Sequence, residues 1–352
     1  MKLQNNDKKA KIASKTKKII KKAISWAGLF FFVLAALVLY NQLSKYQMSD
    51  IKSALFSIPG KNLLYACLAS FVGYIALSSY DYLALRYIKH KISMWKWVFA
   101  GFIGFSVSNN AGHAIVSGGA IRYRLYTRWR IKASEIIKMV TFSGFTYLVA
   151  CFFLIIIGYA ITPDDAFGDG VASKITTTIV ALGSLVGLVI YLTASVLYKK
   201  SINIKGIKLK MPTLNMSLAQ IFIGSIDILM ASLVLYFTLI HFVDIPFNTF
   251  IGAYIIAQIL GVYSQVPGGL GVFELVFSNI IPGTENQAML FGALIAYRII
   301  YYLLPLIISA IALISYEGYL GYRQNKIKKQ HKLTRIKNFI QQKTDNIKHK
   351  GK

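Results

Sequence analysis

Charged residues are scarce in this sequence. They make up 15% of its 352 residues, whereas about 25% is usual in soluble domains. Hydrophobic residues account for 55%, and the mean hydropathy is +0.53. Such a composition excludes an ordinary soluble domain, so we expect an integral membrane protein.

Cysteine and histidine are also rare. The two cysteines, Cys67 and Cys151, both lie inside apolar runs, which argues against a disulfide framework and against a metal cluster. The sequence has no Walker motif, dinucleotide fingerprint or recognisable Ser-His-Asp grouping. We therefore predict no catalytic residues, no metal and no cofactor, and we expect neither enzymatic activity nor ATP-driven pumping in this chain.

Basic residues far outnumber acidic ones, 40 against 13. Half of the basic residues lie in two tails, nine before Ile24 and eleven after Glu317. Tails of this kind usually lie against anionic lipid headgroups and help to set the orientation of the chain. We therefore expect tails 1–23 and 317–352 to contact the surface of the bilayer, and we do not expect nucleic acid as a partner.

Six segments are long and apolar enough to span a bilayer, since a spanning helix needs about 20 residues: 24–43, 61–82, 138–161, 174–197, 217–240 and 288–314. The loops rich in Lys and Arg are 83–97, 121–137 and 198–212. The loops with acidic residues and no Lys or Arg are 162–170, 241–248 and 282–286. The positive-inside rule places the basic loops and both termini in the cytoplasm.

Two further apolar stretches, 98–120 and 249–281, are each interrupted by a Gly-Gly pair. To fit the loop charges, each must leave the membrane on the side it entered, as a re-entrant hairpin does. A full crossing by 249–281 would put the basic C-terminus outside, which the same rule disfavours. The sequence thus predicts an all-α polytopic fold in region 24–316, with half-repeats 24–161 and 174–314 of inverted topology.

The two Gly-Gly stretches read VSGGAIRYRLYTR and VPGGLGVFELVF. We expect re-entrant turns at glycines and a proline that these stretches contain: Gly118, Gly119, Pro267, Gly268, Gly269 and Gly271. Arg124 and Glu274 occupy equivalent positions after the two pairs, so they could form an ion pair or flank a lipid headgroup. For Arg122 and Arg124, a positive-inside loop at headgroup level is an equally good interpretation.

Ionisable residues deep inside a span are costly, so each needs a partner or a function. Glu274 lies among apolar residues, and we interpret it as a buried binding or gating residue rather than an exposed one. Arg298 is about nine residues inside the last predicted span, about 14 Å deep, and Asp227 is similarly deep in its own span. They could pair with each other or contact substrate directly.

Two further interpretations concern the rim and the walls of the site. Asp81 lies at the cytoplasmic end of its span, where a solvated pair with Arg86 is expected. Tyr123 and Tyr301 are expected to line the site, because a tyrosine ring is apolar and its hydroxyl is polar.

These motifs, together with SYDYLALRYIKHK and AYRIIYYLLP, resemble the lysylphosphatidylglycerol synthase transmembrane family, in particular its short stand-alone inner-membrane members. The resemblance extends over about residues 60–316. It implies a polytopic bundle that binds phospholipid and, in the multiple peptide resistance factor, moves aminoacylated phosphatidylglycerol between leaflets. The synthases carry a soluble catalytic domain after the membrane part, whereas this sequence ends in a lysine-rich tail, so lysyl transfer is not expected.

The sequence therefore predicts a translocase or binding protein for an anionic or aminoacylated phospholipid in a bacterial inner membrane. Two other functions stay open at this point. One is a membrane scaffold or accessory protein of envelope lipid metabolism, whose polar groups only lock the bundle. The other is a permease for small solutes.

Overall fold

The structure is a computed structural model that describes residues 48–111, 114–161, 171–198, 200–204, 207–264, 266–281, 287–323 and 326. The predicted first span 24–43, the N-terminal tail 1–23 and the loops 162–170 and 282–286 lie outside these residues, as does most of the C-terminal tail. Five helices in the described part are long and apolar enough to cross a membrane: Gly60–Tyr87, Ala133–Ile161, Thr177–Leu197, Leu214–Leu239 and Met289–Arg323. They confirm an all-α membrane protein and coincide with five predicted spans.

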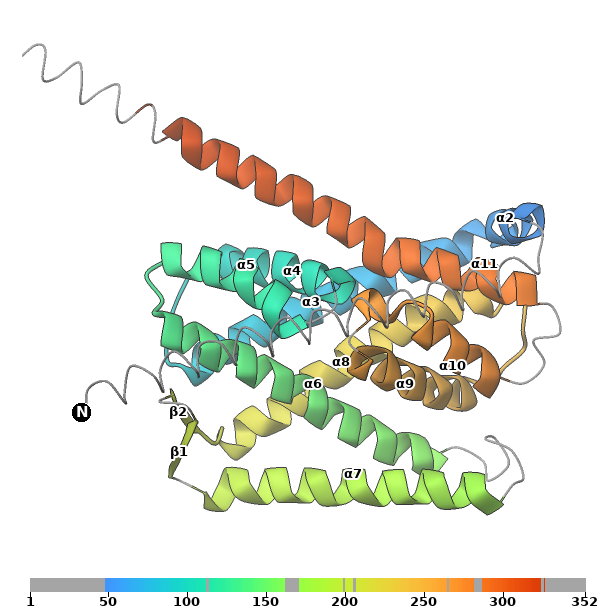
Figure 1. Cartoon of the computed structure of the whole chain (residues 1–352), viewed down its shortest axis with the longest axis horizontal. Coiled ribbons are helices and arrows are strands. Elements are labelled where there is room, and N and C mark those ends of the chain that lie inside the picture. The colour runs from blue at the N-terminus through green and yellow to red at the C-terminus, as the bar shows by residue number, and fades with distance from the viewer. Residues whose placement is uncertain are drawn as a thin grey trace, which may run out of the picture. The chain divides into compact units, whose positions relative to one another are not determined.

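Between these helices lie shorter elements (Figure 1). The described elements up to residue 303 are α2 (Met48–Ser57), α3 (Gly60–Tyr87), α4 (Met94–Ala111), α5 (Ala114–Arg128), α6 (Ala133–Ile161), α7 (Val171–Leu197), β1 (Ser201–Ile204), β2 (Ile207–Lys210), α8 (Leu214–Leu239), α9 (Phe247–Tyr263), the 3-10 turn η1 (Pro267–Gly269), α10 (Val272–Ile280), α11 (Gln287–Arg298) and the π-helical segment η2 (Ile299–Leu303). A helical segment follows over residues 304–323.

The order of elements repeats along the chain. The first copy has α3, the helix pair α4–α5, then α6; the second has α8, the helix pair α9–α10, then α11. The starting residues of α3, α4 and α6 are 60, 94 and 133, and those of α8, α9 and α11 are 214, 247 and 287, which are offsets of 154, 153 and 154 residues. This regular spacing is what a duplicated unit produces.

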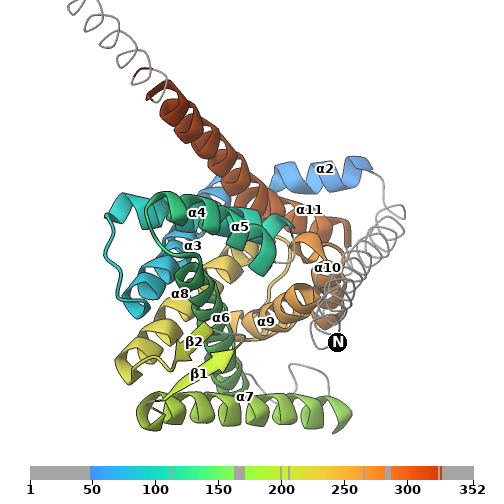
Figure 2. The same ribbon diagram turned by 60° about the vertical axis from the view of Figure 1, so that its left-hand side comes forward.

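Each helix pair forms a hairpin, and we call α4–α5 the first hairpin and α9–α10 the second. Figures 1 and 2 show the two helices of each hairpin side by side. In the first hairpin Gly118 packs on Ser108 and Arg122 packs on Gly104. As the residue number rises along α5, the number of its contact residue on α4 falls, so the two helices run antiparallel. At 1.5 Å per residue, α9 and α10 are each shorter than the roughly 30 Å of hydrocarbon in a bilayer.

Two helix ends at predicted cytoplasmic loops share one geometry. Lys89 after α3 and Arg130 after α5 adopt left-handed backbone angles, with φ of 59° and 67°. In both cases the next amide donates to a carbonyl five residues earlier, His90 to Leu85 at 2.9 Å and Ile131 to Tyr126 at 3.1 Å. This is the Schellman closure, which usually uses glycine. Here basic residues occupy the left-handed position, where their side chains stay at the helix C-terminus.

Small residues allow the central helices to approach closely. α3 packs against α8, its counterpart in the second repeat, and α8 also packs against α6. At Gly224 of α8, a Cβ would lie 2.5 Å from Ala150 Cβ and 2.9 Å from the Thr146 carbonyl on α6. A glycine is therefore required at this crossing, as is common between membrane helices.

The strands β1 and β2 form an antiparallel pair in the loop between α7 and α8, a segment predicted only as a basic cytoplasmic loop. Tyr87 at the end of α3 holds this pair: its hydroxyl donates to the Lys210 carbonyl at 2.6 Å and accepts from the Lys210 amide at 3.0 Å. The Tyr87 ring also stacks on Phe142 of α6 at 4.8 Å. In Figure 2, α7 lies along one edge of the bundle, and it contacts α6 and α8.

Candidate functional site

A buried ion pair joins the first hairpin to α3. Arg122 of α5 is 3% exposed and Asp81 of α3 is fully buried. The Arg122 Nε donates to both carboxylate oxygens of Asp81, at 2.9 and 3.1 Å. The Tyr126 hydroxyl, one turn further along α5, donates to the same carboxylate at 2.8 Å. Burial makes this pair costly to break, because either charge alone would be left without compensation.

Two glycines make room for the Arg122 guanidinium. A Cβ at Gly104 would lie 3.0 Å from Arg122 Cζ, and a Cβ at Gly118 would lie 3.2 Å from its Nη1. The guanidinium also lies over the Phe105 ring, 4.1 Å from its centroid. Within the described part of the chain, Arg122 Nη2 is buried and has no hydrogen-bond partner. Arg122 thus uses one nitrogen for Asp81 and keeps an unused donor.

The prediction of a turn at Gly118 and Gly119 is wrong, because both residues lie inside the helix α5. Gly118 instead permits close packing of the first hairpin: its Cβ would lie 1.8 Å from Ser108 Oγ and 2.6 Å from the Gly104 carbonyl. For Gly119 the nearest neighbour is Val140 Cγ2 at 3.9 Å. Glycine at position 118 therefore allows the two helices to pack closely, whereas no neighbour within the described structure requires glycine at position 119.

The second Gly-Gly pair does form a turn. Gly268, Gly269 and Gly271 have φ of 61°, 62° and 79°, a region that L residues with a Cβ rarely adopt. Pro267 begins the 3-10 turn η1, and Gly271 is the N-cap of α10. The chain can reverse direction between α9 and α10 because three glycines accept these angles.

Glu274 and Arg298 hold that turn in place. Arg298 of α11 donates through Nε to Glu274 Oε1 at 2.7 Å, and its Nη2 lies 2.6 Å from the same oxygen. Its Nη1 donates to the Gly268 carbonyl. Glu274 Oε2 accepts the Gly271 amide at 2.8 Å, which caps α10. The two side chains therefore clamp both ends of the glycine turn, and the Arg298 guanidinium lies over the Tyr302 ring at 4.6 Å.

The turn of the second hairpin lies against the end of α4 in the first. A Cβ at Gly268 would lie 3.5 Å from the Asn109 carbonyl and 3.9 Å from the Asn110 carbonyl. The same Cβ would lie 3.5 Å from Arg298 Nη1. Elements that are about 150 residues apart in sequence thus meet at one point, next to a charged clamp.

The π-helical segment η2 follows Arg298 directly and ends shortly before Pro305. Proline has no amide hydrogen, so position 305 cannot donate the next hydrogen bond of the helix, which would go to Tyr301 in an α-helix or to Ile300 in a π-helix. Two side chains of α3 donate to these carbonyls: Tyr74 donates to the Tyr301 carbonyl at 3.0 Å and Ser70 to the Ile300 carbonyl at 3.2 Å. π-Helical turns inside helices are frequent at functional sites.

Asn110 of α4 completes this support for η2, because its Nδ2 donates to the Tyr302 carbonyl at 3.1 Å. From the sequence, Asn110 was expected to satisfy unpaired backbone of the first hairpin; it satisfies a carbonyl of η2 instead. Ser70 and Tyr74 were not predicted as site residues, and the signal for them was a polar stripe at positions 70, 74 and 78 of α3.

Asp227 of α8 is buried beside η2, with 4% of its surface exposed. The Tyr80 hydroxyl donates to its Oδ2 at 2.9 Å, and the Tyr301 hydroxyl lies 3.4 Å from its Oδ1. Tyr301 therefore contacts the site through its hydroxyl as well as through its carbonyl. This tyrosine was expected in the site, whereas Tyr80 was not.

Three predicted pairings are wrong. Glu274 pairs with Arg298 and not with Arg124, which is exposed on α5. Arg298 consequently does not pair with Asp227, whose contacts are tyrosine hydroxyls. The physical reason is helix rotation: Gly118 and Arg122 are four residues apart on the inward face of α5, and Arg124 lies about 200° around the helix from Arg122.

Asp81 was expected at the interface with Arg86, and this too is wrong, because Asp81 is fully buried and binds Arg122. The predicted end of the span at residue 82 caused the error, since α3 continues to Tyr87. Tyr123 is also not part of the cluster, because 51% of its surface is exposed. On α5 the buried positions are therefore 118, 122, 125 and 126.

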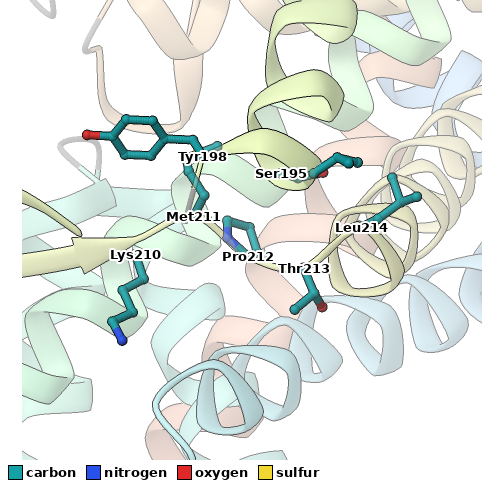
Figure 3. Close-up of a pocket in the computed structure, with 8 residues that line it drawn as sticks. Ser195, Tyr198, Lys210, Met211, Pro212, Thr213 and Leu214 are labelled. Atoms are coloured by element: carbon teal, nitrogen blue, oxygen red, sulfur yellow. The ribbon is translucent and has the colours of Figure 1, made fainter. Parts of the chain in front are cut away.

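A surface pocket of about 430 Å³ lies elsewhere, where the end of α7 meets β2 and the start of α8 (Figure 3). It is lined by Ser195, Val196, Tyr198, Lys210, Met211, Pro212, Thr213 and Leu214. None of the buried charged residues lines it. It therefore belongs to the basic loop and not to the site between the hairpins.

Comparison with known proteins now assigns the fold to a family. Residues 23–309 match the family described as the lysylphosphatidylglycerol synthase TM region. The chain belongs to the lysylphosphatidylglycerol synthase transmembrane family. The matched range contains both hairpins, both ion pairs and the π-helical segment. The resemblance found in the motifs is thereby confirmed.

Individual relatives cover most of the chain. An uncharacterised protein of Synechocystis, slr0712, is 31% identical over 302 residues, which are 85% of this chain and 93% of that protein. The inner membrane protein YbhN of Escherichia coli is 27% identical over 307 residues, 86% of this chain and 93% of YbhN. These relatives and the apolar helices support a multi-pass membrane protein of the lysylphosphatidylglycerol synthase transmembrane family.

Enzymes match over a smaller part of their own length. The phosphatidylglycerol lysyltransferase of Staphylococcus xylosus is 27% identical over 294 residues, which are 81% of this chain and 33% of that protein. The chain thus spans about a third of the lysyltransferase. Membership of the family connects this protein with membrane lipids, and lysyl transfer is an activity named for that larger relative.

Proposed function

We propose that this protein is a phospholipid translocase of a bacterial inner membrane, which moves an anionic or aminoacylated phosphatidylglycerol-like lipid between leaflets. The observation that carries the proposal is the meeting of the two hairpins at Gly268 and Asn109. Each hairpin is fixed by one buried pair of an arginine and a carboxylate, Arg122 with Asp81 and Arg298 with Glu274. Both pairs lie within their own repeat.

The repeat supports transport over a static role. α9 and α10 are too short to cross a bilayer as single helices. Backbone that turns at membrane depth is tolerated only where protein or water satisfies it, as Arg298 does at the Gly268 carbonyl. In transporters built from inverted repeats, one fixed site opens to either side when one repeat moves against the other. We infer that the hairpins are re-entrant and enter from opposite faces.

Arg122 is the residue proposed to bind the lipid phosphate. Its Nε is committed to Asp81, while its buried Nη2 has no partner within the described residues. A phosphate oxygen would satisfy that donor with a charge-assisted hydrogen bond. Since Arg122 is 3% exposed, the first hairpin must move to admit a headgroup.

Glu274 and Arg298 are proposed as the gate of the second hairpin. Their contacts close the glycine turn on both sides, so breaking the pair would weaken the hold of Arg298 of α11 on the Gly268 carbonyl. Gating by an ion pair is reversible, because the partners remain on neighbouring helices.

A leaflet-exchange assay tests the function. Purified protein is reconstituted into vesicles with labelled phosphatidylglycerol, its lysyl form or phosphatidylethanolamine, and the label that remains protected in the inner leaflet is followed after addition of a membrane-impermeant quencher. We expect at least one of the first two lipids to cross faster than in protein-free vesicles. The proposal fails if neither phosphatidylglycerol nor its lysyl form crosses faster than in protein-free vesicles.

Matched variants refine this assay. Replacing Arg122 with Gln removes a charged hydrogen bond worth about 1.5–3 kcal/mol, so exchange should slow by about tenfold or more. Arg128→Gln is the control, because Arg128 is exposed on the same helix. Equal loss in both variants would contradict a headgroup role for Arg122.

Labelling of single cysteines tests the re-entrant topology. Cys67 and Cys151 are first replaced by Ser, and cysteines are then introduced at Asp244 before α9 and at Asn279 near the end of α10, which are both exposed. A re-entrant second hairpin predicts that an impermeant thiol reagent labels both from the same side of intact cells. Labelling from opposite sides would mean that α9 and α10 together cross the membrane.

A further inference from the structure

The described core contains three buried carboxyl groups and two arginines near them. Asp81 and Glu274 each have an arginine within 2.9 Å. Asp227 is buried to the same degree, at 4% exposed, and among the described residues no Lys, Arg or His lies within ion-pair distance of it. One carboxyl group of the core thus has no counter-ion within the described part of the chain.

Asp227 is surrounded by groups that are neutral. Its electrostatic neighbours are Tyr80 and Tyr74 of α3, Tyr147 and Cys151 of α6, and Tyr301 of η2. The hydroxyls of Tyr80 and Tyr301 point at its two oxygens, at 2.9 and 3.4 Å. These elements bring hydrogen-bond donors to the carboxyl group but no charge.

Such an environment suits a group that changes protonation state. An isolated ionised carboxylate in an apolar interior is strongly disfavoured, and proteins usually avoid the cost by protonating it. The two tyrosine donors offset part of that cost when the group is ionised. Asp81 and Glu274 differ in this respect, because each has an arginine nitrogen within 2.9 Å of its carboxylate.

We propose that Asp227 is a proton-binding site that couples the movement of lipid to a proton gradient. This inference rests on the translocase function proposed above. A proton from the water on one side bonds to a carboxylate oxygen of Asp227, and the same bond breaks when the proton leaves to the other side. No electrons are transferred, and no other co-reactant is needed.

Tyr301 connects Asp227 to the gate. It lies in η2, three residues after Arg298, and its carbonyl is held by Tyr74. The Tyr301 hydroxyl lies 3.4 Å from Asp227 Oδ1, and an ionised Asp227 attracts it more strongly than a protonated one, since hydrogen bonds to charged groups are about twice as strong as neutral ones. Protonation weakens that bond and so loosens the segment that positions Arg298 against Glu274.

Infrared difference spectroscopy tests proton binding without any transport. The full chain in lipid nanodiscs is titrated across the physiological pH range, and the carbonyl stretch of protonated carboxyl groups is recorded. We expect one carboxyl group to titrate in wild type, and the signal to be absent in Asp227→Asn and retained in Asp81→Asn. If no carboxyl group titrates, or if the signal survives in Asp227→Asn, the proposal is wrong.

A shape-preserving variant guards against misfolding. Asparagine is nearly isosteric with a protonated aspartate and can still accept from Tyr80, so Asp227→Asn should fold. Should it fail to fold, Tyr80→Phe decides instead: removing a donor to Asp227 should shift the midpoint of the titration, and an unchanged midpoint would contradict the assignment.

A pH gradient across lipid vesicles tests coupling. In wild type, the exchange rate of labelled phosphatidylglycerol should change severalfold when the gradient is imposed, and in Asp227→Asn it should not respond. Exchange that ignores the gradient in wild type would refute coupling and leave the translocase function standing. If no lipid crosses at all, the translocase function fails, and the infrared titration still decides whether Asp227 binds a proton.

Discussion

The ion pair of Glu274 and Arg298, which clamps the turn of the second hairpin, allows a change in the free energy of unfolding to be predicted. Glu274→Gln removes the charge opposite Arg298 while keeping the size of the side chain. The Glu274 side chain is 6% exposed and the Arg298 side chain 12%, so the arginine would be left as a largely buried charge without a counter-ion among the described residues. Loss of one partner of a buried pair costs about 3–5 kcal/mol.

A smaller cost is possible in a membrane, where side-chain hydrogen bonds between helices average about 0.6 kcal/mol. The geometry decides between these values. Arg298 contacts Glu274 Oε1 through two nitrogens, at 2.7 and 2.6 Å, and also donates to the Gly268 carbonyl. Since a full charge pair is involved, we expect Glu274→Gln to lower the free energy of unfolding by at least about 3 kcal/mol.

A double-mutant cycle separates the pair from its surroundings. Free energies of unfolding are measured by steric trapping in bicelles for Glu274→Gln, Arg298→Met and the double variant. The double variant should lose less than the sum of the two, with a coupling of about 1.5–3 kcal/mol. The control cycle combines Glu274→Gln with Arg124→Gln and should be additive within about 0.5 kcal/mol. Additivity for Glu274 with Arg298, or coupling with Arg124, would refute the clamp.

Two further predictions concern packing and the basic loop. Gly118→Ala should destabilise the protein by about 1–3 kcal/mol, because its Cβ would lie 2.6 Å from the Gly104 carbonyl. Gly119→Ala should be nearly neutral in thermal unfolding. Equal melting temperatures for the two variants would contradict this packing. Tyr87→Phe removes both hydrogen bonds to the Lys210 backbone, each worth about 0.5–1.5 kcal/mol. Trypsin should therefore cut the β1–β2 segment about tenfold faster, and an unchanged rate would show that Tyr87 does not hold it.

Much of the fold was predictable because it depends on composition along the chain. Five spans appear as long apolar runs, and α9 with α10 appears as an apolar stretch broken at Pro267–Gly269. Arg298 was recognised as buried from its depth in an apolar run alone. These features are local, since a helix of about 20 apolar residues has few alternatives in a bilayer.

The partners in the site were not predictable to the same degree. Arg122 and Arg124 are two residues apart, and only the rotation of α5 decides that Arg122 faces Asp81. Equivalent positions in the two repeats suggested an ion pair between Arg124 and Glu274. Side chains pair with whatever lies nearest on a neighbouring helix, however, and the residue that lies beside Glu274 is Arg298 of α11. Glycine is equally ambiguous, because it serves a turn at Gly268 and close packing at Gly118.

The sequence by itself determined that this protein lies in the membrane, that its two Gly-Gly pairs recur with a spacing of 150 residues, and that glycines break the second hairpin region. Apolar length and residue type are sufficient for these conclusions, because they follow from the solvent and from the backbone. Tertiary structure alone decided which acid meets which arginine and that Asp227 meets no arginine among the described residues. Such pairing depends on how helices far apart in sequence rotate and pack, which no local pattern encodes.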